Sequence, residues 1–269
     1  MQQAFHTTPI THVAGAICDC LGVEPPQHCE GNLPEVTAQL QALANGAIDR
    51  VLVYNPDAIA RWAYEKYYDT FTPVRQYCPI SVEMLSMMPP KTPVCFASMY
   101  TGASPEVHGI THYTKPTLQL DSVFDALIRA GKKCAIVTVR NQSMHKLFLG
   151  RDMDYYPCAN DAEVIRVALD VIRQDKHDLI CVYNQEYDDV MHRSHPNSLW
   201  SRRALKHYCA SFEQLAQCAE TNWTSHNTAL LCATDHGTHR EWYLLGNHGK
   251  DIPKDRNILH FWGMLPKRD

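Results

Sequence analysis

The sequence predicts an α/β protein with a mixed, mostly parallel sheet sandwiched between layers of helices. Short apolar runs rich in β-branched residues alternate along the chain with longer segments of helical periodicity. This alternation is typical of parallel strands joined by crossover helices. The 269 residues are 45% hydrophobic and 20% charged, as in an ordinary globular protein. We therefore expect one large domain over residues 1–269, with no internal repeat or linker.

The predicted elements follow in chain order. Residues 7–22, which begin with Thr-Thr-Pro, and residues 33–43 carry apolar residues at helical spacing, so we expect a helical N-terminal extension over residues 1–49. Buried strands are predicted at 50–54, 133–139, 178–183, 228–233 and 258–264. Helices are predicted at 57–68, 121–130, 161–174 and 199–222.

Three segments are less regular. Residues 71–90 contain four prolines and read as irregular chain, and residues 94–100 fit either a helix or a strand. A small cap over the sheet could lie within residues 111–160.

Composition limits the classes of function. The net charge is −4 and no dense Lys/Arg tract occurs, so nucleic acid is not favoured as a partner. The N-terminus lacks the pattern of a signal peptide, and no stretch is apolar and long enough to span a bilayer. A cytoplasmic protein with no membrane partner is the expectation; the sequence does not indicate an oligomeric state.

The eleven cysteines are an odd number without an export signal. Several lie inside apolar strand-like runs, where a free thiol packs as a small core residue. Cys18, Cys20, Cys29 and His28 could together hold a structural metal, but their spacing matches no usual zinc site. Free thiols are the favoured interpretation.

Carboxylates and histidines follow the ends of several predicted strands. The candidates are Asp57, Thr92, Asp188 and His192 in Y-D-D-V-M-H, Asp235 and His236 in A-T-D-H-G, and His248 in G-N-H-G. In open α/β sheets, ligands bind outside the carboxyl ends of the strands. Aspartate oxygen and histidine nitrogen suit divalent cations such as zinc or manganese. Seven groups are too many for one ion and suitable for two, which indicates a two-metal hydrolytic site.

The local spacings are compatible with this chemistry. Asp188 and His192 lie four residues apart and would share one face of a helix. Gly237 permits the sharp turn that lets Asp235 and His236 reach one metal. Two cations about 3.5–4 Å apart would clamp the attacking and leaving oxygens of a displacement at phosphorus. A threonine hydroxyl beside them would be activated as a nucleophile.

Each of these elements also has a plainer interpretation when taken alone. Asp188 and His192 could be a solvated helix face, and Thr92 before Pro93 could be a helix N-cap. His248 could be an ordinary loop residue. Their joint occurrence at strand ends in one chain favours the metal site.

The order of these motifs resembles the alkaline phosphatase superfamily, and within it the nucleotide pyrophosphatase/phosphodiesterase branch. The most specific parts are T-G-A-S-P-E-V-H-G-I at 101–110 and T-D-H-G at 234–237. The resemblance runs from about residue 50 to residue 264 and implies an alkaline phosphatase-like fold. The first fifty residues lie outside it.

The resemblance implies a role for each candidate residue. Thr92 matches the nucleophile that carries the phosphoryl group covalently and contacts the metals. Asp57, Asp235 and His236 match the ligands of one metal, and Asp188, His192 and His248 match those of the other. His108 matches a position that is read as structural.

The chain also departs from the branch around the nucleophile. The asparagine expected there or after H-G-I is missing. Tyr113 and Cys95 occupy nearby positions and are predicted to contact substrate; the alternatives are that His112 takes the place of Tyr113 or that the contact is lost. No arginine lies near Thr92, unlike in alkaline phosphatases proper.

The expected function is metal-dependent hydrolysis of a phosphate ester through a phospho-threonine. Phosphodiester or pyrophosphate substrates are favoured, and zinc is favoured over manganese. A metal-dependent phosphomutase and a catalytically degenerate metal-binding protein are the alternatives.

Overall fold

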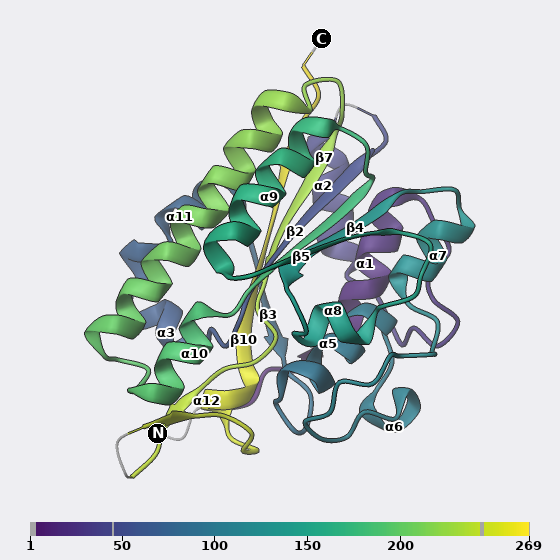
Figure 1. The fold of residues 1–269 in the computed structure, drawn as a ribbon. Helices are drawn as coiled ribbons and strands as arrows, with labels where there is room; N and C mark the ends of the chain where they lie inside the picture. The colour runs from purple at the N-terminus through teal and green to yellow at the C-terminus, as the bar shows by residue number, and fades with distance from the viewer. Residues whose placement is uncertain (1–3, 45, 243–244, 269) are drawn as a thin grey trace.

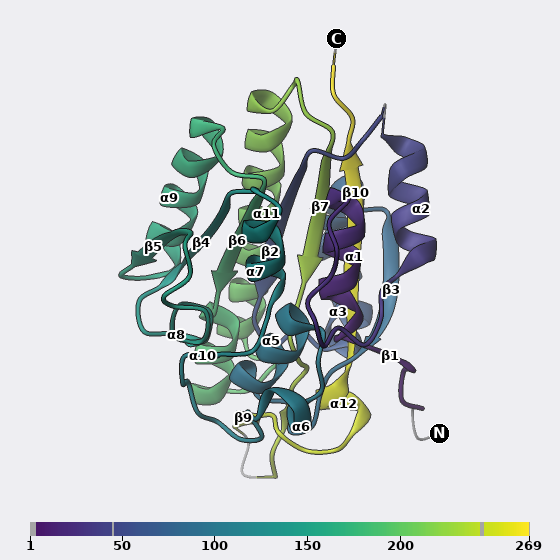
Figure 2. The same cartoon turned by 90° about the vertical axis from the view of Figure 1, so that its right-hand side faces the viewer.

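The computed structural model describes residues 4–44, 46–242 and 245–268 of the chain. Its centre is an eight-stranded sheet in the order β1-β3-β10-β7-β2-β6-β4-β5 (Figures 1 and 2). The strands are β1 (Thr8–Pro9), β2 (Arg50–Pro56), β3 (Ile80–Leu85), β4 (Cys134–Val139), β5 (Asp154–Cys158), β6 (Leu179–Asn184), β7 (Thr228–Ala233) and β10 (Asn257–Leu265). Strand β10 pairs antiparallel with both neighbours, and the other pairs are parallel. The predicted α/β fold class is confirmed.

Helices cover both faces of this sheet. One layer contains α3 (Arg61–Lys66), the 3-10 helix η1 (Tyr68–Phe71), α4 (Thr72–Tyr77), α9 (Asp161–Gln174) and α11 (Leu199–Asn222). The other contains α1 (His12–Leu21), α2 (Pro34–Leu43), α5 (Thr92–Thr101), α7 (Val123–Arg129) and α8 (Ser143–Leu147). Each layer buries its own apolar cluster against the sheet. The central strands β2, β6 and β7 are therefore buried on both faces, which explains their continuous apolar sequences.

Short elements gather at the lower end of the sheet in Figure 1. These are α6 (Pro105–His108), α10 (Glu186–Arg193), α12 (Pro253–Arg256) and the two-residue strands β8 (His239–Arg240) and β9 (Gly246–Asn247). Strands β2, β6 and β7 end here, so this end carries the loops that can form a site.

The N-terminal helices are part of the main core. Val13, Ala14 and Ile17 of α1 have no exposed surface and join the cluster that also contains α5. Strand β1, within the segment expected to be helical from residue 7, adds to the sheet edge instead.

Two expectations about the elements need correction. Residues 71–90 contain α4 and β3, because Pro73 lies in the first turn of the helix and Pro79 directly precedes the strand. Helix α3 begins only at Arg61, since Ala58 takes the left-handed φ of 64°. Within residues 111–160, the range predicted to allow a small cap, α7, β4, α8 and β5 belong to the layers and the sheet.

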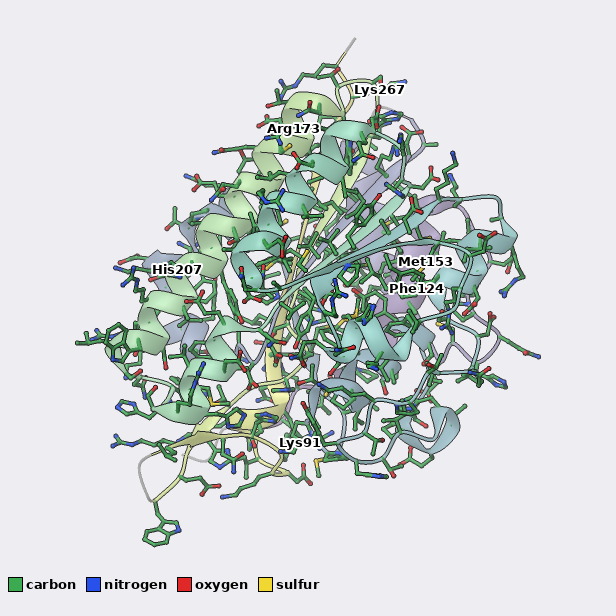
Figure 3. All side chains as sticks on the ribbon, in the orientation of Figure 1. Lys91, Phe124, Met153, Arg173, His207 and Lys267 are labelled. Atoms are coloured by element: carbon green, nitrogen blue, oxygen red, sulfur yellow. The ribbon has the colours of Figure 1, made fainter. Side chains whose placement is uncertain are left out.

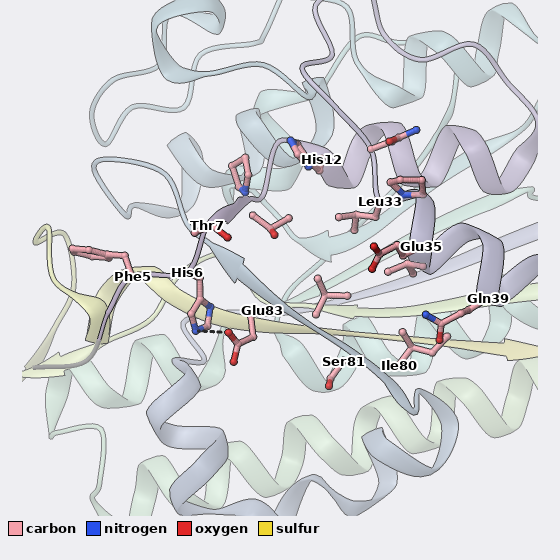
Figure 4. Close-up of a pocket in the computed structure, with 16 residues that line it drawn as sticks. Phe5, His6, Thr7, His12, Leu33, Glu35, Gln39, Ile80, Ser81 and Glu83 are labelled. Atoms are coloured by element: carbon pink, nitrogen blue, oxygen red, sulfur yellow. Dashed lines mark ion pairs between the residues drawn. The ribbon is translucent and has the colours of Figure 1, made fainter. Parts of the chain in front are cut away.

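A groove runs beside the outer edge of the sheet (Figure 4). Strand β1 pairs only with Met84 and Leu85 of β3, and the groove lies between these strands and the start of α2. His6 and Glu83 lie 3.7 Å apart within it. None of the seven predicted ligands lines this groove.

Candidate active site at the carboxyl ends of the central strands

Three neighbouring parallel strands bring the predicted acidic ligands together. Asp57 directly follows β2, Asp235 lies just beyond β7, and Asp188 lies in α10 after β6. Because β2 pairs with both β6 and β7, these three ends are adjacent at one edge of the sheet.

The first cluster surrounds the His236 imidazole. Its Nε2 atom lies 3.6 Å from Asp57 Oδ1 and 3.4 Å from Asp235 Oδ2. The Thr92 hydroxyl lies 3.3 Å from the same nitrogen. All four side chains are buried. The four ligands predicted for one metal therefore converge on one point.

The second cluster is centred on Asp188. Its Oδ1 atom lies 3.4 Å from His192 Nε2 and 3.4 Å from His248 Nε2. The His248 ring stacks on His236 with centroids 4.0 Å apart, so the two clusters are contiguous.

Two groups in the described part of the chain have ligand atoms close enough to hold a metal. They are Asp57 with Asp235 and His236, and Asp188 with His236 and His248, each with ligand atoms within 4.8 Å of one another. His192 is outside both groups and is the most exposed of the predicted ligands.

The donor set fits a divalent cation. Asp57 Oδ1, Asp188 Oδ1 and Asp235 Oδ2 are buried and accept no hydrogen bond within the described structure. Buried carboxylate oxygens without a partner are costly unless they are paired or coordinate a metal. All three point toward histidine Nε2 atoms, which is the arrangement that an ion between them requires.

Backbone carbonyls fix the two central imidazoles. His236 Nδ1 lies 3.0 Å from the Gly237 carbonyl, and His248 Nδ1 lies 2.8 Å from the Pro90 carbonyl. A carbonyl can only accept, so each Nδ1 donates its proton and each Nε2 presents a lone pair. Such outer hydrogen bonds orient histidine ligands of metals.

Burial and neighbouring like charges shift the pKa values of two groups at the site. Burial raises the pKa of Asp57 well above its usual range, and the nearby Asp235 and Asp188 carboxylates raise it further. Burial likewise lowers the pKa of His248, and the neighbouring His236 adds to this effect. Both shifts disfavour the charged form of a group. A bound cation would relieve the repulsion between the carboxylates.

Asp188 and His192 behave as an ion pair. Burial opposes ionisation of Asp188, but the His192 imidazole 3.4 Å away and the charges of the other nearby histidines hold its pKa below the usual range. The same contact with Asp188 raises the pKa of His192.

Side chains beyond the predicted set hold the ligands in place. Tyr183 on β6 donates a short hydrogen bond to Asp57 Oδ2. The amides of Ala58 and His236 donate to Asp235 Oδ1, at 3.2 and 2.9 Å. Tyr183 gave no signal in the sequence, because it ends a buried apolar strand and reads as a core residue.

Thr92 is the first residue of α5, whose ten residues are all buried. The N-terminus of a helix favours anions, because its free amides and its dipole present positive charge there. Lys91, labelled in Figure 3, precedes it and donates from Nζ to the His248 carbonyl at 3.0 Å. The start of α5 is thus hydrogen-bonded to the loop that carries His248.

The two predicted substrate contacts differ in position. Cys95 has no exposed surface, and its thiol lies 3.2 Å from the Ser86 hydroxyl, so we interpret it as a packing residue. Tyr113 is 57% exposed in the loop that follows α6. His108 is buried, lies 2.9 Å from the Ser98 hydroxyl of α5 and accepts from the Ile110 amide, which fits a structural residue.

Cys18, Cys20 and Cys29 are free thiols, as are the other eight cysteines. They belong to neither of the two groups able to hold a metal in the described part of the chain. No helix among the described residues is both long and apolar enough to cross a bilayer.

Comparisons with known proteins agree with the motifs. The family model described as type I phosphodiesterase/nucleotide pyrophosphatase matches residues 54–130, which include Asp57 and Thr92. Among curated proteins, none matches the chain in sequence.

Solved structures share the fold at low identity. Human ectonucleotide pyrophosphatase/phosphodiesterase 5 is 12% identical over 81% of this chain and 88% of that chain, with a TM-score of 0.63. Phosphonoacetate hydrolase from Sinorhizobium meliloti is 16% identical over 73% of this chain and 59% of that chain, with a TM-score of 0.56. The C-terminal periplasmic domain of the phosphoethanolamine transferase EptC from Campylobacter jejuni is 13% identical over 82% of each chain, with a TM-score of 0.59.

The shared fold and the family model matched over residues 54–130 agree with the resemblance that the motifs carry. That model describes type I phosphodiesterases and nucleotide pyrophosphatases.

Proposed function

We propose that this protein is a metal-dependent hydrolase of phosphate esters that uses Thr92 as its nucleophile. One observation carries the proposal. Three buried carboxylate oxygens that accept no hydrogen bond converge on neighbouring histidines, and one of these, His236, contacts the Thr92 hydroxyl.

The seven predicted residues would hold two divalent cations. Asp57, Thr92, Asp235 and His236 would hold one, and Asp188, His192 and His248 the other. The donor set of carboxylate oxygen and imidazole nitrogen suits zinc, and manganese is the alternative. When bound, such a pair lowers the pKa of a neighbouring hydroxyl and stabilises negative charge on phosphoryl oxygens.

The reaction then proceeds in two displacements at phosphorus. Thr92 Oγ1 loses its proton and attacks, the bond to the ester oxygen breaks, and the alcohol or phosphate leaving group departs with a proton. Water next attacks the phospho-threonine, which releases the phosphate product and regenerates the hydroxyl. The N-terminus of α5 favours the negative phosphoryl group in both steps.

Phosphodiesters or pyrophosphates are the substrates that we favour. The matched family model describes enzymes of that kind. A variant of murine ectonucleotide pyrophosphatase/phosphodiesterase 5, 13% identical to this chain with a TM-score of 0.61, is known in complex with AMP. Tyr113, which is exposed in the loop that follows α6, stays a proposed contact for the substrate.

The test combines metal analysis with kinetics. Metal-free protein reconstituted with zinc should hold close to two ions per chain and hydrolyse bis(p-nitrophenyl) phosphate faster than p-nitrophenyl phosphate. Thr92→Ala should lower kcat by roughly 10³-fold or more while the fold is retained, as for other removed nucleophiles.

A matched control exists in the same chain. Thr72 also begins a helix and also precedes a proline, but it lies in α4 and caps the Asp69 carbonyl. Thr72→Ala should therefore leave kcat within a few-fold of the unsubstituted protein. A Thr92→Ala protein with comparable activity, or a protein that binds no ions, would refute the proposal.

A further inference from the structure

We propose that Asp255 and His239 form a positioning pair that sets the geometry between the two metal-ligand segments. The inference rests on the proposed function and concerns the loop that leaves the site at His236 and returns to it at His248.

Asp255 ties three points of this loop together. It has no exposed surface and lies in α12. Its Oδ1 atom lies 2.7 Å from His239 Nδ1, and its Oδ2 atom accepts from the Lys250 amide at 2.9 Å. Its backbone carbonyl accepts from the Gly237 amide at 2.7 Å.

A ring of hydrogen bonds lies across the base of the β8–β9 hairpin. His239 Nε2 lies 3.0 Å from Glu241 Oε1, and Lys250 Nζ donates to Glu241 Oε2 at 2.9 Å. The ring therefore runs from Asp255 through His239, Glu241 and Lys250 back to Asp255. Both nitrogens of His239 face carboxylates, so its imidazole can donate to each.

The anchored residues adjoin the ligands. Gly237 directly follows His236, and Lys250 lies two residues after His248. Gly237 packs so tightly that a Cβ atom there would lie 2.2 Å from the Lys254 carbonyl and 2.9 Å from Ala60 Cβ. This end of the loop is pressed against the segment that carries Asp255, and the other end is hydrogen-bonded to its side chain.

The ring acts on the ligands through the backbone. None of its four members belongs to a group able to hold a metal in the part of the chain described. The ring members instead fix the spacing of the His236 and His248 imidazoles, which stack with centroids 4.0 Å apart. Metal sites require ligands fixed to within about 0.5 Å, and outer contacts contribute about 10–100-fold in metal affinity.

The experiment measures zinc affinity directly, by competition with a chromophoric chelator on the full chain. His239→Gln and Asp255→Asn should each weaken zinc binding by about 10–100-fold. The kcat of each variant, measured at limiting zinc, should recover in part when excess zinc is added. A side chain that only supported the fold would lower the melting temperature and leave both readouts unchanged.

His177→Gln is the matched control. His177 is also buried, at 1% exposure, and its Nε2 atom also lies 2.7 Å from a carboxylate, that of Asp154. It precedes β6 and therefore lies at the opposite end of the sheet from the site. This variant should lose stability and keep the zinc affinity of the unsubstituted protein.

The outcomes separate the two proposals. If the unsubstituted protein binds no zinc, the proposed function fails. If it binds zinc and both loop variants bind as tightly as His177→Gln, the positioning inference fails and the proposed function stands. Should either variant be insoluble, Glu241→Gln opens the same ring from its more accessible side and must show the same direction of change.

Discussion

Each of the three proposed ligand carboxylates has a buried oxygen that accepts no hydrogen bond within the described structure. A buried acceptor without a hydrogen bond costs about 1–3 kcal/mol, and more when it is charged. Here Asp57, Asp188 and Asp235 each contribute such an oxygen, and all three face the same small volume. These three oxygens lower the free energy of unfolding, and a cation bound at the proposed site would offset that cost.

The hydroxyl of Tyr183 provides a prediction at the scale of one residue. It is buried and donates to Asp57 Oδ2, which leaves Oδ1 as the oxygen available to a metal. Tyr183→Phe keeps the ring and removes only the donor. We expect zinc to bind about 10–100-fold more weakly, because the carboxylate loses the contact that orients it.

Tyr155→Phe is the control for this change. Tyr155 also donates to an oxygen of the chain, the Phe148 carbonyl at 2.7 Å, but it lies on the edge strand β5. It should lower the melting temperature without altering zinc affinity. Equal zinc affinities for the two variants would show that Tyr183 only packs.

At the scale of elements, the strands and helices with clear periodicity could be predicted from the sequence. Helices α9 and α11 and strand β7 have the predicted bounds, because each has an uninterrupted apolar pattern. Strand β3 could not be found, since prolines surround it and its burial alternates along an edge. Strand β5 contains Pro157 and lies at the other edge, where proline is tolerated.

The candidate site, too, could be predicted only in part from the sequence. Its ligands lie in motifs of fixed order, so their convergence could be inferred from strand ends. The residues that orient them could not, because Tyr183 and Asp255 contact the site segments only through tertiary structure. A lone buried tyrosine or aspartate has no local pattern that distinguishes it.

The contact between β10 and α4 provides a prediction at this scale. Gly263 lies where a Cβ atom would come within 1.9 Å of the Tyr77 carbonyl. Gly263→Ala should therefore lower the free energy of unfolding by at least about 1–3 kcal/mol, as overpacked core positions do. Urea denaturation measures this. Ser81→Ala, at an exposed position on the neighbouring β3, should change it by less than about 0.5 kcal/mol.

At the scale of the whole molecule, the site makes stability depend on pH. The pKa of Asp57 is raised by burial and by nearby carboxylates, and that of His192 by its contact with Asp188. The pKa of His239 is raised by its hydrogen bond to Asp255. A pKa that is raised on folding favours the folded state at low pH, and this contribution is lost as pH rises through the folded pKa.

The lowered pKa of His248 has the opposite effect on stability, which it decreases at low pH. This effect ends once the histidine of the unfolded chain is neutral, above about pH 6.5. The metal-free protein should therefore lose stability over the interval above about pH 6.5, where the unfolded histidines are already neutral. The stabilisation by added zinc should increase over the same interval, because metals bind deprotonated ligands. Urea denaturation with chelator or with zinc measures both trends. A metal-free protein that gains stability over this interval would contradict the assignment of these groups.

The arrangement of the central strands also determines when the ions can act during folding. Asp57 and Asp235 become neighbours only after β2 has paired with β7, although more than 170 residues separate them in the chain. Contacts of such sequence separation form late and slowly. Zinc bound at the proposed site should therefore not nucleate this fold, and it should slow unfolding while leaving the refolding rate unchanged. On this proposal the chain completes its sheet first and acquires its ions afterwards.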